Sequence, residues 1–227
     1  MCGRFYLDAK ADELAAYFDL PAVPSLKSRY DLAPSQPIMV IRAGERGQEY
    51  ISPHWGLIPF WVKDEKISYR TINSRPETAE SKLVLKAAFK YRRSLIPASG
   101  FYEWAVEKLG KQPYCIHPKR GSLFVFDGLY ENWEGEAGKI IDSCIILLTE
   151  ANLVIAPVYD RMPVILYPSN FDAWLDPNTQ DPAILKALLR SALENDIAVY
   201  SVSRHVSNPR SDAPTCSFSS AAPSTKL

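Results

Sequence analysis

The sequence is poor in the features that mark several large classes of protein. It has no net charge, no apolar run approaching the ~20 residues of a membrane span, and no Gly-rich phosphate loop or G-x-S-x-G motif. Its four cysteines, at positions 2, 115, 144 and 216, form no C-x-x-C pair. We therefore expect neither a membrane protein, nor a disulfide-stapled scaffold, nor a protein that coats nucleic acid through its overall charge.

The first ten residues argue against a secreted protein, and the scarcity of histidine argues against a metalloprotein. The start, MCGRFYLDAK, lacks an apolar segment and carries three charged side chains, so we expect no secretory signal and a cytoplasmic protein with reduced thiols. Only three histidines are present, and Cys115 and His117 on one strand face would supply just two metal ligands. We therefore expect no metal and no cofactor.

The length and the periodicity of apolar residues predict one α+β domain. Helices are expected over residues 8–19 and 76–91. A third helix should begin after the cap Asp181 and Pro182 and carry Leu185, Leu188, Leu189 and Leu193. Strands are expected over residues 38–42, 49–57, 94–98, 101–106, 122–130, 140–149 and 197–203. Because the elements do not alternate as βαβ units, we expect a curved, mostly antiparallel, barrel-like sheet with flanking helices. The domain should cover residues 1–210, and the Ser-, Pro- and Ala-rich residues 211–227 should form a flexible tail.

Cys2 is the most informative residue in the chain. If Met1 is removed, Cys2 presents a free amine with an ordinary pKa of ~7.7–8.0 beside a thiol with a pKa of ~8.5. An amine and a thiol on adjacent carbons can condense with an aldehyde into a five-membered thiazolidine, and no internal cysteine can do this. The alternative is that a cysteine stands at residue 2 by chance.

Two polar residues precede the expected helix at residue 76. Asn73 and Arg75, in the stretch INSRPET, share a face if this segment is extended. Asn73 can then hold a reacting group by hydrogen bonds, while Arg75 grips an oxyanion with two donors. The alternative is that both residues belong to an ordinary capping turn.

Two aromatic stretches suggest a general acid and a surface for bases. Glu103 lies in GFYEW, and apolar surroundings would raise its pKa, unless strand alternation turns it to solvent. Phe60 and Trp61 open a segment, residues 60–93, with nine basic and four acidic side chains. These rings can stack on unpaired bases or lie in the core, and the basic segment can bind phosphates or form a solvated helix face.

Five motifs in one order resemble the SOS response-associated peptidase (SRAP) family. They are MCGRF, WGLIPFW, INSRPET, SLIPASGFYEW and YDRMPVIL, and the resemblance extends to about Arg210. It implies a mixed α+β fold around curved antiparallel sheet. It also implies a protein that recognises abasic sites in single-stranded DNA and crosslinks covalently to them. We further expect a monomer that associates with the nucleoid during DNA damage.

The resemblance assigns roles to individual residues. Cys2, freed by self-processing, peptidase-like removal of Met1, would attack the aldehyde of the opened deoxyribose. Asn73 would position Cys2, and Glu103 would move protons during the lyase-like chemistry. The DNA contacts would come from Arg4, Phe60, Trp61, Arg75 and Arg161.

Two residues depart from the family pattern. Tyr159 stands where the family usually has a histidine that helps to open the sugar and to reverse the crosslink, and Asp31 stands where asparagine is more usual. A phenol with a pKa of ~10 is a poor base at neutral pH. We therefore expect slower formation or release of the crosslink than in a relative with histidine, unless His54, His117 or His205 reaches the site.

Two other functions remain open from the sequence. An N-terminal-nucleophile amidohydrolase would also use Cys2 with its own amine as base, although the expected glutamine-binding motifs are missing. A non-catalytic module for single-stranded DNA, weakened by Tyr159, would bind reversibly and in a salt-sensitive way. A general protease is not indicated, because no Cys–His pair is evident.

Overall fold

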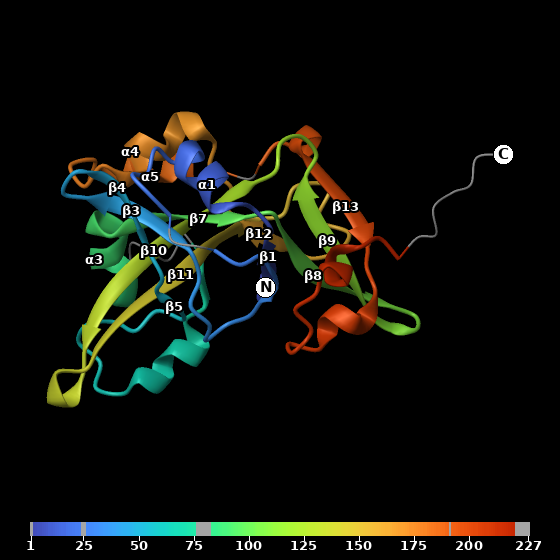
Figure 1. The fold of residues 1–227 in the computed structure, drawn as a ribbon, viewed down its shortest axis with the longest axis horizontal. Coiled ribbons are helices and arrows are strands. Elements are labelled where there is room, and N and C mark those ends of the chain that lie inside the picture. Colours follow the sequence, from blue (N-terminus) through green and yellow to red (C-terminus); the bar gives the residue numbers. More distant parts are fainter. Residues whose placement is uncertain (1, 24–25, 76–82, 191, 221–227) are drawn as a thin grey trace.

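Two sheets meet along the first strand of the chain. The computed structural model describes residues 2–23, 26–75, 83–190 and 192–220. Strand β1 (Phe5–Leu7) belongs to the smaller sheet and lies near the middle of the molecule, with the larger sheet beside it (Figure 1). The expected α+β architecture around curved, mostly antiparallel sheet is confirmed.

The smaller sheet contains β1 and the end of the described chain. In spatial order its five strands are β13 (Ile197–Ser201), β9 (Gly110–Pro118), β8 (Gly100–Glu107), β1 and β2 (Arg29–Leu32). All neighbours in this sheet are antiparallel. Phe5 lies opposite Leu32 on one side and opposite Phe101 on the other, so β1 is hydrogen-bonded along both edges.

The larger sheet carries the long central strands. Its main path runs through β12 (Arg161–Pro163), β11 (Ile140–Glu150), β10 (Phe124–Glu134), β7 (Arg93–Ala98), β3 (Val40–Gly44) and β4 (Gly47–Ile51). Two short strands, β5 (His54–Trp55) and β6 (Asn73–Ser74), pair in parallel with β11. Every residue of β7 is buried, including the polar Arg93 and Ser94 that precede its apolar part.

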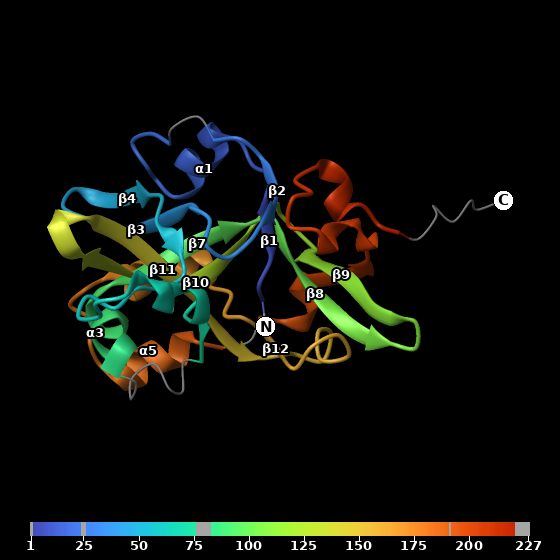
Figure 2. The same cartoon turned by 90° about the horizontal axis from the view of Figure 1, so that it is seen from below.

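Helices cover the larger sheet on both sides. They are α1 (Ala11–Tyr17), α3 (Leu83–Tyr91), α4 (Phe171–Leu175) and α5 (Pro182–Leu188). Figure 2 shows α1 on one side of this sheet and α3 and α5 on the other. Asp181 caps α5 by accepting a hydrogen bond from the Ala183 backbone N–H at 2.8 Å, as its sequence indicates.

An aromatic cluster joins the two sheets beneath β1. The ring of Phe5 packs edge-on against Trp55 and Phe126, with ring centroids 5.3 and 5.9 Å apart. Phe101 of β8 meets Phe126 in the same manner at 5.8 Å. On the opposite face of β1, the ring of Tyr6 stacks on Tyr102. Because β1 is buried on both faces, it lacks the alternating pattern that reveals most surface strands.

Several elements differ from their expected limits. Of the helix expected over residues 76–91, the structure describes α3, and residues 76–82 lie outside the described residues. Helix α5 ends at Leu188, before Leu189 and Leu193, which were expected to continue it. Strand β9 was not expected from the sequence, because its polar start and its internal Pro113 are unusual in a strand paired on both sides.

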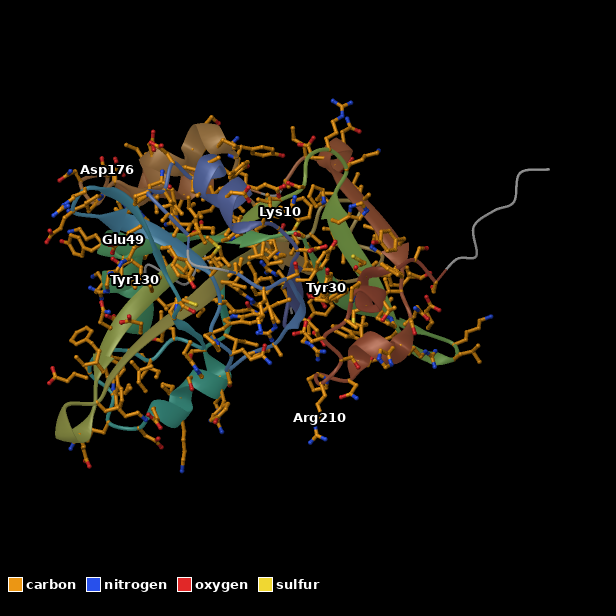
Figure 3. The ribbon with its side chains drawn as sticks, viewed as in Figure 1. Lys10, Tyr30, Glu49, Tyr130, Asp176 and Arg210 are labelled. Carbon is orange, nitrogen blue, oxygen red and sulfur yellow. The ribbon has the colours of Figure 1, made fainter. Side chains whose placement is uncertain are left out.

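The described fold extends beyond residue 210, further along the chain than we expected. Residues 203–220, here called the C-terminal segment, contain η5 (Arg204–Ser207) and η6 (Pro214–Ser217), and Ser219 forms a bridge with Val202. Cys216 is fully buried, whereas Arg210 points away from the domain (Figure 3). Residues 211–220, which we expected to belong to a flexible tail, thus include a 3-10 turn and buried side chains, and residues 221–227 lie outside the described residues.

Two features are absent from the residues that the structure describes. None of their helices is long and apolar enough to cross a membrane. They also contain no group of three or more His, Cys, Asp or Glu side chains placed to hold a metal ion. Short 3-10 turns complete the fold, namely η1 (Glu65–Arg70), η2 (Glu136–Gly138), η3 (Pro168–Asn170) and η4 (Glu194–Asp196).

We predict that Gly56→Ala destabilises the fold more than Gly47→Ala. Both glycines have a positive φ that strains an alanine, but a Cβ at Gly56 would lie 2.5 Å from the Ser68 carbonyl oxygen, and one at Gly47 would meet open space. Chemical denaturation should give an additional loss of about 1–3 kcal/mol for Gly56→Ala. Equal losses for the two variants would contradict this packing.

Candidate active site around Cys2

The pairing of β1 with β8 brings the start of the chain beside Glu103. The Tyr102 backbone N–H donates to the Arg4 carbonyl at 2.9 Å, and Phe5 lies opposite Phe101. Extending this antiparallel register by two residues places Gly3 opposite Glu103. Cys2 precedes this pair and is fully buried, so the structure brings the expected nucleophile to the expected acid.

Asn73 reaches Cys2 from the larger sheet. Strand β6 aligns Asn73 with Ile146 of β11, and the Trp55 indole N–H donates to the Ile72 carbonyl at 2.9 Å just before it. The Asn73 side-chain amide donates to the Cys2 carbonyl oxygen at 2.6 Å. Its Oδ1 is buried without a hydrogen-bond partner in the described part of the chain. The Asn73 side-chain N–H therefore holds the Cys2 backbone in place, and its Oδ1 remains as a hydrogen-bond acceptor within the site.

Glu103 is suited to both giving and taking a proton. Only 3% of the residue is exposed, so the interpretation in which it faces solvent is wrong. Burial raises its pKa to about 7, although the positive charge at the amino terminus and hydrogen bonds oppose this shift. Near neutral pH the carboxyl group is therefore present in both protonation states, which is the condition for a general acid and base.

The Cys2 thiol is held in its protonated form. Burial raises its pKa well above the ordinary value, and the charge of Glu103 adds to this effect. The amino-terminal charge and a hydrogen bond from the Arg4 backbone N–H act in the opposite direction. A reaction at this sulfur consequently needs a base to remove the thiol proton.

The charges of Glu103, Asp160 and Arg75 all act on Tyr159. Burial raises the pKa of Tyr159, Glu103 and Asp160 raise it further, and Arg75 lowers it. These electrostatic effects place the four side chains in one group. Asp160 also raises the pKa of Glu103, a contribution that the sequence analysis missed because nothing in the motif shows where this exposed carboxylate lies.

The three histidines occupy other elements. His54 lies on β5, with Glu65 as its charged neighbour. His117 lies on β9, where its ring contacts Tyr200 of β13, and His205 lies in η5. Tyr159, where the resemblance implies a histidine in relatives, is the side chain whose pKa the charge of Glu103 raises.

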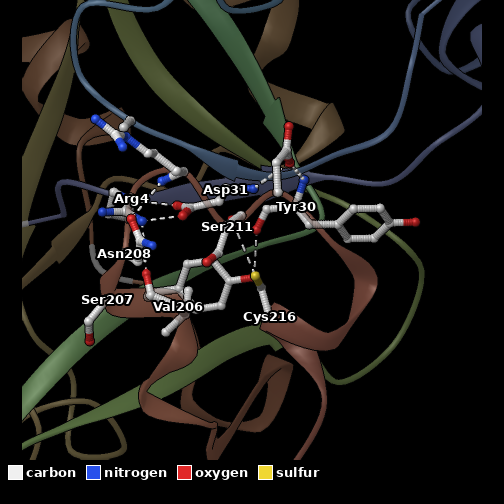
Figure 4. Close-up of polar contacts among 12 residues, drawn as sticks. Arg4, Tyr30, Asp31, Val206, Ser207, Asn208, Ser211 and Cys216 are labelled. Carbon is white, nitrogen blue, oxygen red and sulfur yellow. Dashed lines mark hydrogen bonds and ion pairs between the residues drawn. The ribbon is translucent and has the colours of Figure 1, made fainter.

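The expected DNA-contacting residues differ in their surroundings. Phe60 and Trp61 are 58% and 47% exposed, which excludes the core interpretation for both. Arg161 opens β12, two residues after Tyr159. Arg4, in contrast, forms a bidentate ion pair with Asp31 and donates a hydrogen bond to the Val206 carbonyl (Figure 4). No pattern in the sequence indicated that Asp31 is the partner of Arg4.

We predict that Glu103→Gln stabilises the protein at pH 8 but not at pH 4. The folded-state pKa of about 7 lies above the ordinary 4.5, so the stability contributed by the protonated form is intact below pH 4.5 and is lost as the pH rises through 7. Glutamine does not ionise and avoids this loss, which amounts to at most about 3 kcal/mol. Thermal melts across this pH range should show the difference.

The exposed Glu107 at the end of the same strand provides the control for this prediction. Glu107→Gln should melt in parallel with the wild type at every pH. If Glu103→Gln and the wild type also melt in parallel, Glu103 does not have the raised pKa.

Comparison with known proteins identifies the family of this chain. The SOS response associated peptidase (SRAP) family profile matches residues 1–209. Abasic site processing protein YoqW of Bacillus subtilis is 38% identical over 94% of this chain and 97% of its own length. Abasic site processing protein YedK of Escherichia coli is 26% identical over 77% of this chain and 79% of its own length.

Solved structures share the fold. A crystal structure of a protein from Bacteroides thetaiotaomicron superposes with a TM-score of 0.86 and 25% identity, covering 97% of this chain and all of the other. A phage-related protein from Bordetella bronchiseptica superposes with a TM-score of 0.71 and 26% identity, over 88% of this chain and 94% of the other. The chain therefore belongs to the SOS response-associated peptidase family.

Proposed function

We propose that this protein captures abasic sites in single-stranded DNA by a covalent bond to Cys2, after removal of Met1, as part of the response to DNA damage. The observation that carries the proposal is the hydrogen bond from Asn73 to the Cys2 carbonyl, with Glu103 buried beside the same residue. Relatives that match most of the chain are named abasic site processing proteins, which supports this class of substrate.

The chemistry needs an aldehyde, which the ring-opened deoxyribose of an abasic site supplies. The Cys2 amine adds to the aldehyde carbon to give a carbinolamine, and loss of the hydroxyl as water gives an imine. The thiol sulfur then adds to the imine carbon, and a proton is gained by the nitrogen. A thiazolidine forms and one water is released, with no change in oxidation state.

Glu103 and Asn73 divide the work in this scheme. Protonated Glu103 donates a proton to the carbinolamine hydroxyl, which then leaves as water. The resulting carboxylate accepts the proton of the Cys2 thiol, which is unreactive while its raised pKa keeps it protonated. The buried Oδ1 of Asn73 can accept a hydrogen bond from the carbinolamine. The same thiol and acid would serve the peptidase-like release of Met1.

The surroundings of the site suit a flexible, negatively charged strand. Arg75 follows Asn73 directly after β6, and Arg161 follows Tyr159 by two residues, so both can approach phosphates beside the lesion. Phe60 and Trp61 expose rings on the segment that leads to Asn73, where unpaired bases can stack on them. This set of contacts favours single-stranded over duplex DNA, whose bases are already stacked.

We predict a denaturation-resistant adduct between the wild type and an oligonucleotide with one abasic site. Single-stranded DNA without the lesion should give no such band in a denaturing gel. Cys2→Ala should abolish the adduct because it removes the sulfur that closes the ring. Glu103→Gln should slow adduct formation by about 100-fold or more, the usual contribution of general acid–base catalysis.

Two results would lead to another function. Reversible, salt-sensitive binding without any adduct from protein that has lost Met1 would indicate a non-catalytic DNA-binding module. Glutaminase activity that depends on Cys2, again without an adduct, would indicate an amidohydrolase.

We predict that Tyr159→His accelerates adduct formation, adduct release, or both, by at least about tenfold. The raised pKa of the phenol makes it a hydrogen-bond donor and a poor base at neutral pH, whereas imidazole exchanges protons in that range. Single-turnover gels measure formation, and transfer of the oligonucleotide to a trapping amine measures release. Unchanged rates for both steps would contradict a limiting role for Tyr159, and Tyr159→Phe serves as the control for loss of the hydroxyl.

A further inference from the structure

The guanidinium of Arg4 is engaged inside the protein. Its Nε and Nη2 donate to the two carboxylate oxygens of Asp31, and Nη2 also donates to the Val206 carbonyl at 2.8 Å (Figure 4). The Arg4 side chain is 12% exposed and that of Asp31 is not exposed at all. The positive charge of Arg4 is therefore compensated by an adjacent carboxylate before any DNA arrives.

Asp31 is held in place from two directions. Strand β2 pairs with β1, and the Tyr102 hydroxyl donates to the Tyr30 carbonyl at 2.9 Å. From the C-terminal segment, Asp212 accepts the backbone N–H groups of Tyr30 and Asp31 at 2.6 and 3.1 Å. Asp212 also pairs with the side chain of Arg29. The carboxylate that receives Arg4 is thus part of a fixed framework.

The third contact of Arg4 comes from the C-terminal segment, which is itself anchored. Val206 is fully buried. The Trp104 indole N–H donates to the Ser207 hydroxyl at 3.0 Å, and the Cys216 thiol donates to the Ser211 carbonyl at 3.3 Å. Arg4 consequently ties the amino-terminal segment to both β2 and the C-terminal segment.

The backbone of Arg4 acts directly on Cys2. Its N–H donates a hydrogen bond to the Cys2 sulfur, and its carbonyl accepts one from the Tyr102 N–H at 2.9 Å. A displacement of Arg4 would therefore move the nucleophile relative to Glu103, the residue that follows Tyr102.

We propose that Asp31 makes Arg4 a positioning residue for Cys2, held in an internal ion pair, and that Arg4 does not serve as a ligand for a DNA phosphate. The proposal rests on the proposed function of Cys2. It assigns the phosphate contacts to arginines such as Arg75, and it gives Asp31 a part in the reaction although Asp31 itself touches no reacting atom.

Salt dependence of binding distinguishes a phosphate ligand from an internal ion pair. The double variant Arg4→Gln/Asp31→Asn removes both charges together and leaves no unpaired buried carboxylate. Its binding to single-stranded DNA without a lesion, measured at several KCl concentrations, should keep the wild-type slope of log Kd against log salt. The matched variant Arg75→Gln should reduce the slope by about 0.7, the value for one phosphate contact on a single strand.

The rate of adduct formation at saturating DNA provides the second readout. Arg4→Lys keeps the charge but cannot make the two-pronged contact with Asp31, so it should slow this rate by at least about tenfold. Asp31→Asn should also slow the rate, because the carboxylate that holds the guanidinium is lost. All rates are measured well below the melting temperature of each variant, with the folded fraction measured by circular dichroism.

Three outcomes overturn the inference alone. The first is a double variant that loses as much salt slope as Arg75→Gln, whatever its rate. The second is Arg4→Lys with the full wild-type rate. The third is a rate of adduct formation by Arg4→Lys and Asp31→Asn that falls only in proportion to the folded fraction of each variant. A wild type that forms no adduct would instead overturn the proposed function, and the inference with it.

Discussion

The pairing of β1 with β8 is the constraint on which the site depends. β1 has only three residues, yet it lies between two strands and is buried on both faces, with Phe5 in the aromatic cluster between the sheets. A strand held in this way can slip in neither direction without moving large rings out of the core. Its register therefore fixes Cys2, at an end of the chain that would otherwise fray, beside Glu103.

Burial makes this site reactive and costly at once. Desolvation raises the pKa of Glu103 to about 7 and raises that of the Cys2 thiol, so near neutral pH the thiol is protonated and the carboxyl group is present in both protonation states. The charged forms that the chemistry requires are the less stable ones in this environment. Asn73 contributes a hydrogen bond to Cys2 from the other sheet, so both sheets must be in place before the three residues meet. A site of this kind gives up some stability in exchange for function.

The sequence predicted the members of the site better than it predicted their supports. Cys2, Asn73 and Glu103 lie in motifs whose order identifies the family, and the structure brings them together. The partner of Arg4 was not predicted, because Asp31 and Val206 are distant in sequence and their pairing leaves no local pattern. The same reason explains the fold of the C-terminal segment: its short turns have the composition of a tail, and contacts with distant residues, among them those with β2, Trp104 and Val202, order them.

The mass of the intact adduct tests the central claim most directly. Wild-type protein is mixed with an oligonucleotide that contains one abasic site, and the product is weighed by mass spectrometry and then digested to locate the linkage. The account predicts the mass of the chain without Met1 plus the oligonucleotide minus one water, with the linkage on Cys2. An adduct on another residue, or on a chain that retains Met1, would contradict the account.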